Sequence, residues 1–232
     1  GLGIKAPRYN GVRVRLPAKA RRVHDELSAN FTVAFEEAGC VLAPNAGAVG
    51  IKLRQVCNGG VIDSSTGRVV ELHTAKADAL VRLVEELQGA PLLAGYEFTA
   101  DGDRFQAGLA AAGFDVRRID GDTPREARNA RYADFNEGRV QVLLCQYVCA
   151  ARGLNLQKSC NHVALTGMLW DLEIFIQFLK RIHRKGQTRQ VTVHEFVAED
   201  TRDEVVIQAR RAKNRAQERF LKLLEDYNRE HY

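Results

Sequence analysis

Two arginines toward the C-terminal end of the chain have the type and spacing of a polyphosphate-binding pair. They belong to the segment Gln177-Phe-Leu-Lys-Arg181-Ile-His-Arg184-Lys-Gly-Gln187. If a helix carries this segment, Arg181 and Arg184 project from one face near its end. Guanidinium groups bind phosphate oxygens through forked, charge-assisted hydrogen bonds, and a well-placed arginine accelerates phosphoryl transfer. A solvated basic helix end has the same spacing, so both interpretations stay open for this segment alone.

A second candidate segment, Cys149-Ala-Ala-Arg152-Gly153-Leu-Asn155-Leu-Gln157, directly follows a predicted strand. Loops at the carboxyl edge of an open parallel sheet commonly bind ligands. Gly153 allows a phosphate or ribose to approach the backbone, and Asn155 offers both a hydrogen-bond donor and an acceptor. A simple turn into a buried connection would have a similar sequence, so the segment is a weak signal by itself.

The elements that must position these residues follow the pattern of a parallel sheet. From about residue 70 onward, short β-branched runs alternate with helical stretches, as in βαβ units. We predict an α/β fold with a mostly parallel sheet of five to six strands and helices on both faces. The predicted strands cover residues 91–96, 114–119, 140–145, 162–166 and 191–197, and the predicted helices cover 101–112, 124–136 and 171–182.

The flanking segments predict an edge strand and additional helices. Residues 12–16 alternate like an edge strand, and helices are expected over 18–38, over about 48–57 and over 73–87. Thr201-Arg-Asp-Glu204 has the pattern of a capping box that opens a long surface helix. We therefore divide the chain into an edge strand with a helical annex (1–69), a core lobe (70–199) and a C-terminal brace helix (200–232).

Composition narrows the class of protein without identifying it. The net charge of +5 and the isoelectric point near 9.0 agree with a polyanionic partner. No run of about 18 uncharged apolar residues occurs, and the first residues lack the apolar region of a signal peptide, so we expect a soluble, cytoplasmic protein without a membrane partner. The five cysteines are scattered. We expect reduced thiols and no metal site.

Together, the motifs resemble the C-terminal RecA-like lobe of Swi/Snf-like superfamily-two helicases, closest in form to phage and bacterial members. Residues 151–156 resemble motif V, residues 177–187 resemble motif VI, and residues 92–96 resemble motif IV. The likeness covers nearly the whole chain. It extends through Lys52-Leu-Arg-Gln55, His73-x-x-Lys76, Ile119-Asp-Gly121-Asp-Thr-Pro and Thr201-x-Asp203-Glu204.

The resemblance implies an ATP site shared between two lobes. Arg184 matches the arginine finger, Arg181 its phosphate-contacting neighbour, and Gln177 the residue that helps to orient them. Gly153 and Asn155 match the motif that couples the nucleotide to the DNA strand.

The resemblance also implies a DNA track across the lobe. Trp170 falls where related translocases place an aromatic side chain near the minor groove, although a core position at a strand end is an equal alternative. Arg152 offers a phosphate contact where the family has small residues. Arg128 belongs to a basic stripe that follows a phosphate backbone or is merely solvated. Tyr96 and Gly121 complete the DNA-binding set.

The implied cofactors are ATP and Mg²⁺, with the metal held mainly by an N-terminal lobe. Neither a G-x-x-x-x-G-K-[ST] loop nor a magnesium-binding Asp-Glu motif is recognised in these residues. We therefore expect the chain to be inactive alone and to act with an N-terminal RecA-like lobe, in the same chain or in trans, on duplex or branched DNA rather than RNA. The alternative is a non-catalytic nucleic-acid-binding module with a degenerate helicase fold. An oxidoreductase is disfavoured because no G-x-G-x-x-G follows a predicted strand.

Overall fold

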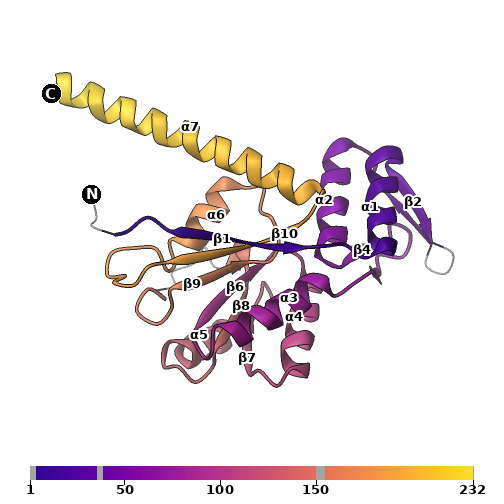
Figure 1. Ribbon diagram of the computed structural model, residues 1–232, viewed down its shortest axis with the longest axis horizontal. Coiled ribbons are helices and arrows are strands. Elements are labelled where there is room, and N and C mark those ends of the chain that lie inside the picture. The colour runs from indigo at the N-terminus through magenta and orange to yellow at the C-terminus, as the bar shows by residue number, and fades with distance from the viewer. Residues whose placement is uncertain (1–3, 36–38, 150–154, 232) are drawn as a thin grey trace.

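A six-stranded parallel sheet forms the centre of the computed structural model, which describes residues 4–35, 39–149 and 155–231, without the side chains of 35, 39 and 217–231. The strand order is β1-β10-β9-β6-β8-β7 (Figure 1). The predicted α/β class and the five core strands are confirmed, and the predicted edge strand joins the same sheet through β10. The strands are β1 (Arg8–Val14), β6 (Leu92–Tyr96), β7 (Val116–Ile119), β8 (Val142–Gln146), β9 (His162–Leu165) and β10 (Thr192–Ala198).

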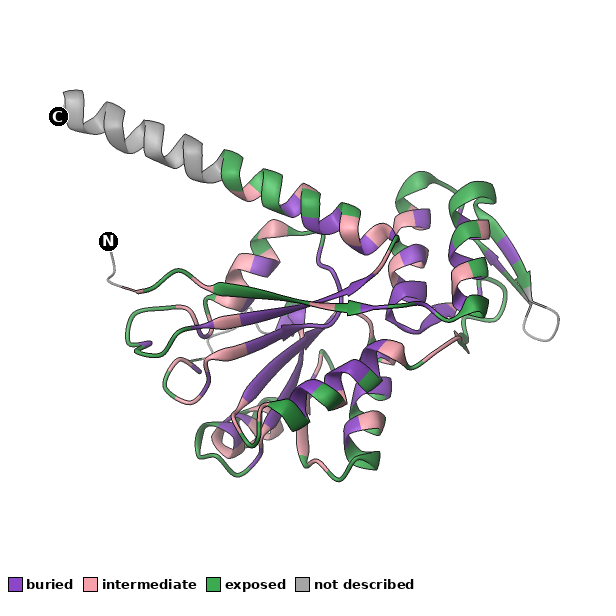
Figure 2. Ribbon diagram, viewed as in Figure 1, coloured by how far each residue is buried: buried purple, intermediate pink, exposed green. Residues whose placement is uncertain are grey.

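Helices cover both faces of this sheet, as the near-continuous apolar strands require. One core cluster joins α3 (Ala75–Glu86) and α4 (Thr99–Ala111) to the sheet. The opposite cluster joins α5 (Arg125–Asn136), α6 (Leu172–Leu179) and the start of α7 (Arg202–His231) to it. Figure 2 shows that the central strands are almost entirely buried. A short 3₁₀ turn, η1 (Tyr147–Cys149), follows β8.

The annex lies beside the carboxyl ends of the strands and has its own core (Figure 1). In the annex, the helices α1 and α2 pack against each other and against short antiparallel hairpins. Its elements are α1 (Ala18–Asn30), β2 (Thr32–Phe35), β3 (Gly39–Leu42), α2 (Ala46–Asn58), β4 (Gly60–Ile62) and β5 (Val69–Glu71).

The first annex helix is shorter than predicted. Phe31 adopts the left-handed conformation with φ of 61°, and its amide donates to the carbonyl of Leu27 at 3.1 Å, which ends α1. The next residues then pair as a β-hairpin, with Thr32 opposite Leu42. The prediction of one helix over 18–38 is therefore wrong. The apolar residues of Thr-Val-Ala-Phe fit the repeat of a helix or that of a strand, and pairing with β3 selects the strand.

The start of α7 also differs from its prediction. The hydroxyl of Thr201 accepts the amide of Asp203 at 3.2 Å and donates to the carbonyl of Ala198 at 2.7 Å. The carboxylate of Glu204 lies 3.8 Å from the guanidinium of Arg13 on β1. Glu204 is therefore used to hold the edge strand, and the reciprocal capping box is not formed.

A buried lysine joins the annex, the sheet and α7. Lys76, at the start of α3, is 0% exposed. Its ammonium donates to Asp203 Oδ2 at 2.6 Å and to Asn58 Oδ1 at 2.9 Å. The amide of Asn58 in turn donates to Asp101 of α4 at 2.8 Å. One buried polar network thus fixes four helices, since an unpaired charge at this depth would be strongly unfavourable.

We predict that Lys76→Met destabilises the chain by about 3–5 kcal/mol, because it leaves the carboxylate of Asp203 buried without its cation. The double variant Lys76→Met/Asp203→Leu loses less than the sum of the two single changes. Urea unfolding measures all three free energies. Additive losses would show that the two side chains do not stabilise each other.

Candidate nucleotide and DNA site

Helix α6 carries the residues predicted to contact ATP and has a defined start. Asp171 caps it by accepting the amides of Glu173 at 2.8 Å and Ile174 at 3.1 Å. Phe175 and Phe178 are buried against the sheet. The helix ends at Leu179, earlier than the predicted 171–182. Arg181 and Arg184 consequently lie in the turns that follow α6, and the prediction that they share a helix face is corrected.

These turns are pinned to the lobe by Gln187. This side chain is 8% exposed, and its amide nitrogen donates to the carbonyl of Cys160 at 2.9 Å, just before β9. Gly186 adopts φ of +96°, which lets the chain turn away. The last residue of the sequence motif therefore supports the position of the arginines, and it does not face a ligand.

The two arginines lie in different environments. Arg184 is exposed, and its guanidinium donates to Asn155 Oδ1. Arg181 is half-buried, with Nε donating to the carbonyl of Gln177 at 3.0 Å. Burial, with the neighbouring charge of Arg184, lowers the pKa of Arg181 from its usual value. The structure thus brings together Asn155 and Arg184, which the sequence placed in two separate motifs.

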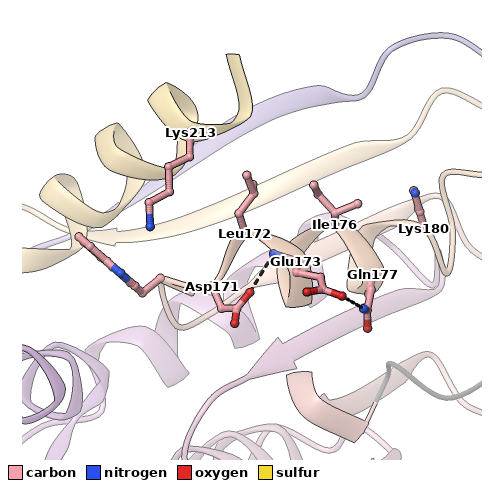
Figure 3. A pocket seen from close by; sticks show the side chains of 8 residues that line it. Asp171, Leu172, Glu173, Ile176, Gln177, Lys180 and Lys213 are labelled. Atoms are coloured by element: carbon pink, nitrogen blue, oxygen red, sulfur yellow. Dashed lines mark hydrogen bonds between the residues drawn. The ribbon is translucent and has the colours of Figure 1, made fainter. Parts of the chain in front are cut away.

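Gln177 lies on the outer face of α6. Its amide nitrogen donates to Glu173 Oε1 at 3.0 Å, one turn earlier, so its side chain does not hold the arginines in this conformation. Figure 3 shows it beside a groove of about 710 Å³ between α6 and α7. The groove is lined by Trp170, Asp171, Leu172, Glu173, Ile176, Gln177, Lys180 and Lys213.

The predicted DNA-binding residues that the structure describes lie in different environments. Tyr96 is 0% exposed, and its hydroxyl donates to the carbonyl of Ile119 at 3.3 Å, so this residue supports the end of β7 from within the core. Gly121 is exposed, and its amide donates to Gln146 Oε1 at 3.3 Å. Arg128 is half-buried and donates to the carbonyl of Thr123 at 3.2 Å, which shapes the loop before α5.

Trp170 lies apart from that loop, in the groove beside α6. Its ring is 43% exposed and lies beneath the ammonium of Lys213, which is 4.8 Å from the ring centroid. It is therefore accessible to a ligand, and it is not the core residue of the alternative prediction. Arg152 and Gly153 lie outside the described residues.

The annex contributes a partly buried ion pair that the sequence did not predict. Arg54 of α2 contacts Glu97 at 3.0 Å, directly after β6. Burial raises the pKa of Glu97 to about 7 despite this partner. Burial likewise raises the pKa of the neighbouring Asp101 to about 6. The ion pair joins Glu97 to a residue that is distant in the sequence, so a local sequence pattern carries no signal of it.

We predict that Glu97→Gln reduces the dependence of stability on pH. A carboxyl group with a raised folded-state pKa stabilises the fold at low pH and loses that contribution as pH rises through about 7. Urea unfolding measures the free energy of unfolding at about pH 5 and about pH 8. In the wild type this group lowers it by roughly 1–3 kcal/mol between the two pH values, and the variant lacks that decrease. An equal pH dependence in both proteins would contradict the assignment.

The comparisons with known proteins agree with this fold. The model of the helicase conserved C-terminal domain matches residues 75–186. Putative protein p41 of Acyrthosiphon pisum secondary endosymbiont phage 1 is 30% identical over 226 residues, which cover 95% of this chain and 47% of p41. DNA repair protein RAD5A of Arabidopsis thaliana is 28% identical over 152 residues, covering 62% of this chain and 15% of RAD5A. The chain thus spans about half of the phage relative and less of RAD5A.

The solved structure of the C-terminal part of the Fun30 ATPase domain has the same fold, with a TM-score of 0.67, 14% identity and 89% coverage of both chains. Across the described residues, no helix has the length and apolar character needed to span a membrane. Residues 75–186 therefore match the helicase conserved C-terminal domain, and the chain is similar to the C-terminal lobes of Swi/Snf-like superfamily-two helicases.

Proposed function

We propose that the chain is the C-terminal motor lobe of a DNA-dependent ATPase that couples ATP hydrolysis to translocation on DNA or to its remodelling. The observation that carries this proposal is the contact between Arg184 and Asn155, because it joins a phosphate-binding cation to the segment expected to follow DNA. The relatives named as DNA repair proteins support DNA as the track. The phage relative supports a setting in the cytoplasm of a bacterial or phage-infected cell.

The donor chemistry of the arginine turn fits a triphosphate. Arg184 is exposed, and Arg181 lies three residues before it in the same pinned turn. Guanidinium groups stay charged in proteins and present several donors in a fixed plane. When a second lobe presents ATP, we propose that Arg184 exchanges Asn155 for the γ-phosphate and that Arg181 contacts a neighbouring oxygen. Bound ATP with Mg²⁺, held mainly by that other lobe, supplies the bond that is hydrolysed.

The same exchange offers a route from nucleotide to DNA. Asn155 Oδ1 accepts from Arg184 in this conformation. Once the arginine moves to phosphate, that oxygen loses its donor, and the segment holding Asn155 takes a new arrangement. We propose that Gly153 and Arg152, which precede Asn155 in the sequence, contact the DNA backbone, with Gly121, Arg128 and Trp170 as further DNA contacts. The burial of Tyr96 limits it to a supporting position.

The test is Arg184→Ala in the chain joined to an N-terminal lobe. DNA-stimulated turnover is expected to fall roughly 10³-fold or more, because the cation that stabilises the transferred phosphoryl group is lost. DNA affinity is expected to persist. Arg184→Lys does not restore turnover, since an ammonium lacks the planar fork.

The matched control is Lys185→Ala, which removes a positive charge from the neighbouring exposed position and keeps turnover. Unchanged turnover in Arg184→Ala, with altered DNA binding alone, would favour the non-catalytic nucleic-acid-binding module instead.

A further inference from the structure

A cavity of about 300 Å³ lies where the annex meets the carboxyl edge of the sheet. Residues of α2 and of the β4–β5 hairpin form one side, and residues after β6 with the last residue of β8 form the other. It is accessible from solvent, since Val69 is 39% exposed and Thr99 is also exposed at its border. Its lining comprises Gln55, Gly60, Val61, Ile62, Val69, Glu97, Phe98, Thr99, Ala100, Asp101 and Gln146.

The walls of the cavity are mainly apolar. Ile62 and Val69 line the cavity from the hairpin and Phe98 lines it from the opposite side, whereas Val61 is fully buried. A volume of about 300 Å³ is at the lower end for small-molecule pockets. A single flat heterocycle suits this size and lining better than a charged triphosphate does.

A few polar groups interrupt the apolar lining. Gln55 Oε1 accepts the amide of Ile62 at 3.2 Å, which leaves the amide nitrogen of Gln55 as a donor. Glu97 Oε2 is buried without a hydrogen-bond partner, while the other oxygen faces Arg54 at 3.0 Å. Since the pKa of Glu97 is raised to about 7, this carboxyl group can accept or donate near neutral pH. Apolar walls with a donor and a carboxyl group match the faces and edge of a nucleobase.

The position of the cavity relates it to the DNA track. Gln146 lines the cavity and at the same time accepts the amide of Gly121 at 3.3 Å. Gly121 is exposed on the loop after β7 and belongs to the proposed DNA contacts. A DNA strand crossing this loop would therefore pass next to the cavity.

From this geometry we propose that the cavity holds the base of an unpaired nucleotide in the DNA track, stacked against Phe98 and packed against Ile62 and Val69. The proposal rests on the proposed function, because it takes DNA as the track. Extruding a base from an intact duplex costs a few kcal/mol, and that cost is smallest for a nucleotide that is already unpaired. With such a site, the chain is expected to prefer branched or bulged DNA over a continuous duplex.

The experiment measures the affinity of the full chain for two labelled DNAs of equal length, a continuous duplex and a duplex with a single-nucleotide bulge. The wild type is expected to bind the bulged DNA about tenfold more tightly, within the range that one base gains from stacking on an aromatic side chain. Val69→Trp narrows the cavity from an exposed edge position, so this preference is lost while duplex affinity is kept. With 2-aminopurine at the bulge, emission changes on binding to the wild type and not to Val69→Trp.

Val205→Trp is the matched control, because it makes the same enlargement at an exposed valine of α7 that does not line the cavity. It keeps both the preference and the emission change. Equal affinity of the wild type for the two DNAs, or an unchanged preference in Val69→Trp, would overturn the base site while leaving the proposed function intact. Absence of binding to either DNA would instead contradict DNA as the track.

Discussion

The arrangement of the molecule depends on one buried cation. Lys76 is fully enclosed, and its ammonium is neutralised by Asp203, the second residue of α7, and hydrogen-bonded by Asn58, the last residue of α2. A lysine at this depth is stable only with such partners, so α2, α3 and α7 must meet at one point. That meeting point lies beside the carboxyl edge of the sheet, where ligand-binding loops of open α/β sheets gather. The network thus fixes the annex against the side of the lobe that is proposed to contact DNA.

At this edge of the sheet, some charged side chains are neutralised by partners within the chain, and others remain available to a ligand. Where the annex meets the lobe, Arg104 contacts both Glu71 at 2.7 Å and Asp101 at 3.4 Å. Its charge is therefore neutralised by carboxylates of the same chain. Arg184 is different, because it is exposed and its partner Asn155 is neutral. An arginine bonded to an amide oxygen can exchange that partner for a phosphate with a gain in Coulomb energy. This difference supports the proposed exchange of Arg184 from Asn155 to a phosphate that another lobe presents.

Much of the fold was predictable because local sequence determines it. The buried strands are short apolar runs at the predicted positions, and α2 ends close to its predicted end, where Gly59 adopts φ of 124°. Local pattern failed where distant partners decide the outcome. Phe31 ends α1 because the following residues pair with β3, and Glu97 forms its ion pair with Arg54 of α2, which is distant in the sequence. In the site, the motifs identified Arg184 and Asn155 separately, but their contact spans 29 positions and required the folded lobe.

The central claim is that Arg184 acts on a phosphate presented by another lobe. A crystal structure of the chain joined to an N-terminal lobe, with Mg²⁺ and a non-hydrolysable ATP analogue, tests it most directly. The account predicts the guanidinium of Arg184 at about 2.7–2.9 Å from a γ-phosphate oxygen, released from Asn155. A closed, nucleotide-bound structure in which Arg184 still donates to Asn155, or points to solvent, would contradict it.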